Sequence, residues 1–354
     1  MIFWIGNIVL FIIYNFFLSI SQLKKEQKNS FLLLIMFLQL LFMYTFGSQN
    51  IFPDTLPYLQ GFEYSSKIGW LDIPNITYGD ANLKAEIGWW YYNKILSSIY
   101  NNSTYLLFAS GFIYLLAYFK LIKKHSLVTW LSIFLFIMTV FYTSFFLLRQ
   151  TLAVSICLFS LRYIVERKFL KFFLLIGIAF CFHQTSLIFI TLYFLYPLKL
   201  NNKSFFIYIG LALILSLAFR QMVNIATSNL IFYATYGSDD SYHLVQNNTS
   251  LYISLSVFIF INFCYYPFKK INNYEKIFLF MLLLFLFVEF SRIGLAGTIG
   301  RLNLYFIASI IILLPNAIKR VKKPMIRYIY MTTISILYLI LMMQQMYYGF
   351  DLIF

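Results

Sequence analysis

Charged side chains are scarce in this 354-residue chain. Asp, Glu, Lys and Arg make up 11% of the sequence, whereas 61% of the residues are hydrophobic. A soluble domain carries about 25% charged residues, and here the apolar residues form runs of roughly the 20 residues that cross a bilayer. The composition therefore excludes a soluble protein and indicates an integral membrane protein.

Acidic residues and cysteines are also few. The 12 Asp and Glu residues stand against 27 Lys and Arg residues, which gives a net charge of +15. The basic residues lie in short clusters between apolar runs, so we expect them to set membrane topology rather than to bind nucleic acid. The three cysteines lie inside apolar runs without a C-x-x-C motif, and the three histidines are dispersed. The sequence thus predicts no disulfide framework, no metal site and no cofactor.

The apolar runs predict an all-α, polytopic membrane protein with about twelve transmembrane helices in a single domain, residues 1–354. The expected spans are 3–20, 31–47, 104–121, 127–147, 149–165, 169–182, 184–198, 204–220, 251–268, 276–291, 301–317 and 326–347. Lys24, Lys25 and Lys28 follow the first span, so the positive-inside rule places that loop in the cytoplasm. Strict alternation then puts 20 of the 27 basic residues on the cytoplasmic side and both termini on the outer side.

Two of the expected outer loops are longer than turns. They cover residues 48–103 and 221–250, and loops of that length are uncommon unless they are functional or disordered. Within the first loop, residues 85–99 have an apolar helical face and four consecutive aromatic residues. This pattern predicts a helix that lies on the outer membrane surface.

Four arginines lie at the outer ends of expected spans, against the topological preference: Arg149, Arg220, Arg292 and Arg301. Such side chains can reach up to lipid headgroups or cap helix ends, and this is the favoured interpretation for Arg220. The alternative is a site for an anionic, lipid-linked substrate, because the planar guanidinium matches phosphate oxygens. Arg292 could instead pair with Glu289, one helical turn away.

His183 is a second candidate for a functional role. Only 27 residues separate the cytoplasmic Lys171 from Lys199, so each arm is too short to cross a ~30 Å hydrocarbon core. The intervening His183 should therefore lie within the protein below the outer surface, where polar groups indicate a functional site. The alternative is a structural histidine bonded to a backbone carbonyl. The outer-loop acids Asp54 and Glu86 could likewise be solvated surface residues.

These residues fall into motifs along residues 40–310. The motifs are D-x-x-x-Y-x-x-x-F (Asp54, Tyr58, Phe62), E-x-G (Glu86, Gly88), R-Q-x-L-A (Arg149, Gln150, Leu152, Ala153), F-H-x-x-S (Phe182, His183, Ser186) and R-x-x-x-Y-F (Arg301, Tyr305, Phe306). Their order resembles the EpsG-like branch of the Wzy-type polymerases, which assemble bacterial O-antigen, capsule and exopolysaccharide.

The resemblance implies a membrane glycosyltransferase at the outer face of the bacterial cytoplasmic membrane. Such enzymes join oligosaccharide units carried on undecaprenyl pyrophosphate, which is the leaving group. On this hypothesis Arg149 and Arg301 bind the pyrophosphate and Arg292 assists. His183 or Glu86 is the catalytic base, and Asp54, Tyr58 and Gln150 shape the sugar site. Membrane lipids, a chain-length regulator and a flippase are further candidate partners.

Two other classes of membrane protein fit the same features. A flippase for the same lipid-linked oligosaccharide would also have many spans and membrane arginines, although transporters commonly show internal repeats, which this sequence lacks. A membrane O-acyltransferase would also use a histidine in a membrane cavity, but no second motif on the cytoplasmic side suggests an acyl-donor site.

Overall fold

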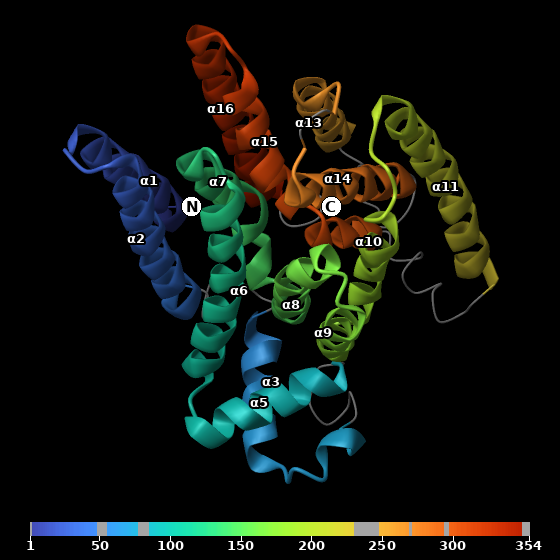
Figure 1. Ribbon diagram of the computed structural model, residues 1–354. Helices are drawn as coiled ribbons and strands as arrows, with labels where there is room; N and C mark the ends of the chain where they lie inside the picture. Colours follow the sequence, from blue (N-terminus) through green and yellow to red (C-terminus); the bar gives the residue numbers. More distant parts are fainter. Residues whose placement is uncertain are drawn as a thin grey trace. The chain divides into compact units, whose positions relative to one another are not determined.

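A computed structural model describes residues 2–47, 55–76, 85–229, 248–268, 271–293 and 297–348 (Figure 1). Within these ranges all secondary structure is helical. The chain divides into two compact units, and we consider each by itself. The first unit comprises residues 1–124 and 140–190, and the second comprises residues 125–139 and 191–354.

The first unit contains the following helices in chain order. They are α1 (Ile2–Ile20), α2 (Lys25–Phe46), α3 (Thr55–Lys67), the short η1 (Ile73–Asn75), α5 (Ile87–Ile99), α6 (Ser103–His125), η3 (Thr143–Phe145), α8 (Leu148–Val165), α9 (Phe169–Phe182) and η4 (Gln184–Phe189). The second unit holds α7 (Thr129–Phe136), α10 (Ile190–Leu195), α11 (Asn202–Asn229), α13 (Asn248–Tyr265), α14 (Asn273–Ser291), η5 (Gly297–Tyr305), α15 (Ala308–Arg320) and α16 (Pro324–Tyr348). The π-helical turn η2 (Ile137–Phe141) follows α7.

Helices capable of crossing a membrane occur in both units. Five of the described helices, α2, α6, α8, α11 and α16, are long and apolar enough to span, and η5 with α15 forms a further candidate bent by 59°. Helical structure occupies every range that the sequence predicts as a span. The all-helical membrane fold is therefore confirmed, whereas the number of twelve spans and the sidedness of the termini stay predictions.

Residues 87–99 form the helix that the sequence predicts in the first outer loop. This helix, α5, buries Trp89 and Trp90 in the first unit and leaves Ile87, Ile95 and Ile99 exposed. Figure 1 shows α5 lying across α3. An exposed apolar face suits a helix at a membrane surface, and that location stays a prediction. The loop expected at 221–250 is helical at both ends, because α11 continues to Asn229 and α13 begins at Asn248, and its residues 230–247 lie outside the described residues.

The chain breaks its helical hydrogen bonding just before α8, and side chains from α2 and α3 supply the missing donors. Tyr44 donates to the carbonyl of Ser144 at 3.0 Å, Thr55 to that of Phe145 at 3.5 Å, and Tyr58 to that of Phe146 at 3.4 Å. Unpaired carbonyls inside a membrane protein are costly, so these bonds stabilise the break. They thereby fix where α8 begins.

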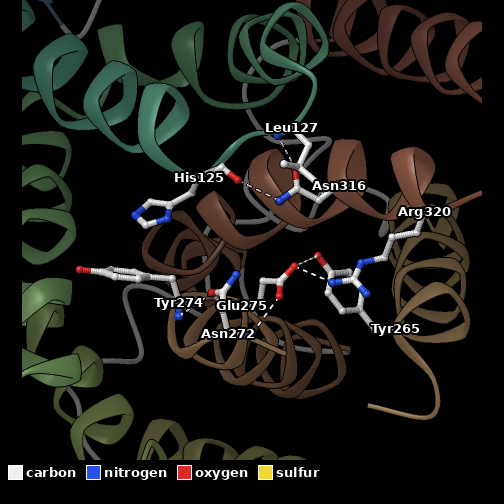
Figure 2. Close-up of polar contacts among 8 residues, drawn as sticks. All are labelled: His125, Leu127, Tyr265, Asn272, Tyr274, Glu275, Asn316 and Arg320. Carbon is white, nitrogen blue, oxygen red and sulfur yellow. Dashed lines mark hydrogen bonds and ion pairs between the residues drawn. The ribbon is translucent and has the colours of Figure 1, made fainter. Parts of the chain in front are cut away.

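In the second unit a polar network joins the ends of several helices (Figure 2). Glu275, in the first turn of α14, accepts a hydrogen bond from Arg320 at 2.7 Å and from the Tyr265 hydroxyl at 3.2 Å. Its other oxygen accepts from the backbone N–H of Asn272, which completes a capping box. The network therefore links the ends of α13, α14 and α15.

Asn316 makes the second part of this network. Its side chain accepts from the N–H of Leu127 at 2.7 Å and donates to the carbonyl of His125 at 2.9 Å. Asn316 is buried in α15, so α15 holds the backbone turn that leads into α7.

We predict that Asn316→Leu destabilises the protein by about 2–4 kcal/mol, because it leaves one donor and one acceptor of the buried turn unpaired. The measurement is thermal unfolding of the purified protein in detergent. Ser309→Ala in the same helix is the control, since among the described residues the Ser309 hydroxyl bonds to the carbonyl of Phe306 in its own chain segment and to no other element. Equal melting temperatures for the two variants would show that Asn316 does not hold the turn.

Candidate functional site

A carboxylate, an imidazole and a guanidinium from three separate elements meet in the first unit. Glu86 is the residue before α5, His183 ends α9, and Arg149 lies in the first turn of α8. One oxygen of Glu86 lies 3.0 Å from Nδ1 of His183, and the other forms an ion pair with Nη1 of Arg149. We call these three residues the Glu86 cluster.

Local backbone geometry directs these side chains toward one another. Glu86 has an extended conformation (φ −69°, ψ 153°) and its carboxylate does not cap α5, so it is available to other partners. His183 is extended as well (φ −159°, ψ 119°), which ends α9 and turns the chain. The next residue, Gln184, donates its backbone N–H to the same Glu86 oxygen at 3.3 Å.

Glu86 is ionised at neutral pH. Burial by itself would raise the pKa of Glu86, but the hydrogen bond from His183 and the charge of Arg149 outweigh burial and hold the pKa below its usual value. An ionised carboxylate only accepts hydrogen bonds, so Nδ1 of His183 must carry the proton. In the neutral imidazole, Nε2 is then the nitrogen with the free lone pair.

All three side chains of the cluster are largely shielded, yet each retains some accessible surface. The exposed fraction of the side chain is 14% for Glu86, 20% for Arg149 and 26% for His183. Electrostatic interactions at such a depth are stronger than at an open surface. A small polar group could still reach the imidazole and the guanidinium.

Gly88 allows α5 to approach α9 closely enough for the cluster to form. A Cβ atom at this position would lie 2.6 Å from the carbonyl oxygen of Cys181 and 2.7 Å from its Cβ. A Cβ atom is essentially never found this close to another heavy atom, so any side chain at position 88 would push the two segments apart. Because Gly88 is two residues from Glu86 and Cys181 is two residues from His183, this contact sets the separation of the two functional side chains.

Two predicted sugar-site residues lie inside the first unit. Tyr58 is buried in a hydrophobic cluster, where its ring contacts Trp89 with 5.3 Å between centroids. Its hydroxyl supports the break before α8, as described above. Gln150 is also buried, with 2% of its surface exposed. Asp54, the third of these predictions, lies outside the described residues.

Arg292 and Arg301 belong to the second unit. Arg292 follows α14 and forms an ion pair with Glu289 at 2.9 Å. The pairing of these two residues, which the sequence suggested as an alternative, is therefore observed. Glu289 also accepts a hydrogen bond from Asn303 at 2.5 Å. Asn303 and Arg301 lie in η5, where Arg301 is partly exposed. No motif or charge pattern in the sequence singles out Asn303, which is identified only by its burial beside Glu289.

The hydroxyl groups after His183 differ in accessibility. Ser186 of the F-H-x-x-S motif is fully buried, whereas Thr185 is partly exposed.

Among the residues that the structure describes, no group of three or more His, Cys, Asp and Glu side chains is placed to hold a metal ion.

Comparison with known protein families gives a match for this chain. A family model for the EpsG family matches residues 30–352, which is nearly the whole chain.

The chain belongs to the EpsG family.

This result confirms the resemblance found in the sequence, and the match spans both units. Neither a curated protein nor a solved structure matches the chain. As an EpsG-family protein with helices that can span a membrane, the chain is a membrane protein related to polysaccharide synthesis. The family match covers every residue of the Glu86 cluster.

We predict that Gly88→Ala separates α5 from α9 and lowers the melting temperature. Overpacking of this kind costs about 1–3 kcal/mol. Gly177→Ala is the matched control, because it lies in α9 and a Cβ there would meet nothing within 4 Å; alanine at a helical glycine should be neutral or stabilising. If thermal unfolding in detergent shows the same change for both variants, the close approach does not constrain the fold.

Proposed function

We propose that this protein polymerises oligosaccharide repeat units carried on undecaprenyl pyrophosphate, at the outer face of the bacterial cytoplasmic membrane. The observation that carries the proposal is the Glu86 cluster, because it combines an oriented base with a cation in one partly shielded place. Membership of the EpsG family supports the same conclusion. The products would be O-antigen, capsule or exopolysaccharide.

The proposed reaction is a glycosyl transfer. A hydroxyl oxygen of one lipid-linked unit forms a bond to the anomeric carbon of the growing chain. The bond from that carbon to the pyrophosphate oxygen breaks, and polyprenyl pyrophosphate leaves with the electron pair. The proton of the attacking hydroxyl passes to a base and then to solvent, so the reaction needs no co-reactant.

His183 is the better candidate for that base, and Glu86 is a positioning residue. Both oxygens of Glu86 are already engaged, one with His183 and Gln184 and the other with Arg149. A carboxylate with a lowered pKa is also a poor proton acceptor. Nε2 of His183 can accept the hydroxyl proton, while Glu86 holds the imidazole and stabilises the positive charge that develops on it.

Arg149 is the candidate ligand for the leaving pyrophosphate. Its guanidinium has five N–H donors, and its ion pair with Glu86 occupies Nη1. Nε is buried, so the N–H groups of Nη2 and the second N–H of Nη1 are the ones that can bind phosphate oxygens as charge develops there. A role for Arg292 or Arg301 at the same phosphates stays a prediction of the sequence, and the carboxylate partner of Arg292 makes it the weaker candidate.

We predict that His183→Ala and Arg149→Ala each abolish long polymer in cells and leave lipid-linked single units on the outer side of the membrane. Losing a positioned base lowers a rate by about 10²- to 10⁴-fold. The measurement is gel analysis of surface polysaccharide together with the location of the accumulated units. His125→Ala is the matched control, since His125 contributes its backbone carbonyl and a ring contact to the second unit.

The location of the units separates the competing functions. Accumulation on the cytoplasmic side would identify a flippase, and normal polymer lacking acyl groups would identify an O-acyltransferase. Long polymer ladders from both variants at normal protein levels would contradict the assignment of the site.

A further inference from the structure

A hollow on the surface of the second unit lies outside the site described above. Its volume is about 600 Å³, which is within the range of small-molecule sites. The lining residues share one face of the first three turns of α16: Met325, Tyr328, Ile329, Thr332 and Thr333. This face therefore combines apolar side chains with three hydroxyl groups.

The hollow opens toward the region that lipid would occupy. Pro324–Met343 is one of the candidate spans, and only 17% of its apolar window is buried within the protein. Met325, Tyr328 and Ile329 are all exposed. If α16 spans the membrane, as its length and composition predict, a molecule against these side chains lies within the bilayer, and a membrane lipid is the occupant that fits.

Positive charge lies directly at one end of the hollow. Lys322 and Lys323 are exposed and immediately precede α16. Lys323 is two residues from Met325, which limits their Cα separation to about 7 Å. Arg320 differs from these lysines because Glu275 neutralises it.

The charge of the two lysines is not compensated locally. The sequence contains no acidic residue between Glu289 and Asp351. Among the described residues neither Lys322 nor Lys323 has an ion pair. Exposed lysines at the end of a span mark that end as cytoplasmic, and the cytoplasmic leaflet supplies anionic lipids.

We propose that the hollow beside α16 binds an anionic phospholipid of the cytoplasmic leaflet. The phosphate lies against Lys322 and Lys323, and an acyl chain lies along Met325 and Ile329. No described residue accepts a hydrogen bond from the hydroxyl of Thr333, so this group can donate to a lipid ester carbonyl, whereas that of Thr332 donates to the backbone of Tyr328 at 3.0 Å. A zwitterionic lipid has no net charge to match the lysines and binds more weakly.

The test is native mass spectrometry of the full-length protein with phosphatidylglycerol or phosphatidylcholine. We expect selective retention of phosphatidylglycerol and an affinity about 10- to 30-fold lower in the double variant Lys322→Gln/Lys323→Gln. The matched control is Lys24→Gln/Lys25→Gln, which removes two exposed lysines at the start of α2 and should change the affinity much less.

A second pair of variants tests the hollow itself. Thr333→Trp fills it while keeping both lysines, and should also reduce binding of phosphatidylglycerol. Leu215→Trp adds similar bulk at an exposed position of a different helix, α11, and should not. Any one of three results would overturn the proposal. These are equal binding of the two lipids, equal losses of affinity from the two lysine double variants, and full binding by Thr333→Trp. None of these readouts depends on polymerase activity.

Discussion

The arrangement of the site in the first unit depends on the hydrogen bonds and the ion pair of the Glu86 carboxylate. This carboxylate bonds to the end of α9 through His183 and Gln184, and to the start of α8 through Arg149. A buried carboxylate is costly unless its charge is matched. Removing it would leave the Arg149 cation without its partner and the imidazole without its orientation. The same group therefore supports both the packing of three helices and the proposed chemistry.

Two backbone features allow that carboxylate to reach its partners. The absence of a side chain at Gly88 lets α5 contact the backbone of Cys181. The helical break at 143–146, supported by hydroxyl groups of α2 and α3, sets the start of α8 and hence the position of Arg149. Irregular backbone within a membrane protein is tolerated where neighbouring groups satisfy it, and here it positions a functional side chain.

Hydropathy and charge predict the apolar helices, because membrane spans are specified by local composition. They do not predict α3, which lies within the expected outer loop, or the break after α7 inside the expected span 127–147. They also singled out Arg149 and His183, since a polar side chain in an apolar run has an evident cost. Glu86 pairs with Arg149 and His183, which lie 63 and 97 positions further along the chain. This pairing could not be predicted from the sequence, because it arises from tertiary packing. Tyr58 illustrates the same limit: its contact with Trp89 also arises from tertiary packing, while its role at a sugar site stays a prediction.

The central claim is that Glu86 acts through His183, and a double-mutant cycle on polymerisation rate tests it most directly. The rates of Glu86→Gln, His183→Ala and the combined variant would be measured with lipid-linked units and purified protein. If Glu86 acts through the histidine, Glu86→Gln slows the His183→Ala variant far less than it slows the unsubstituted protein, and any remaining loss reflects the ion pair with Arg149. Independent, multiplicative losses from the two substitutions would contradict the account.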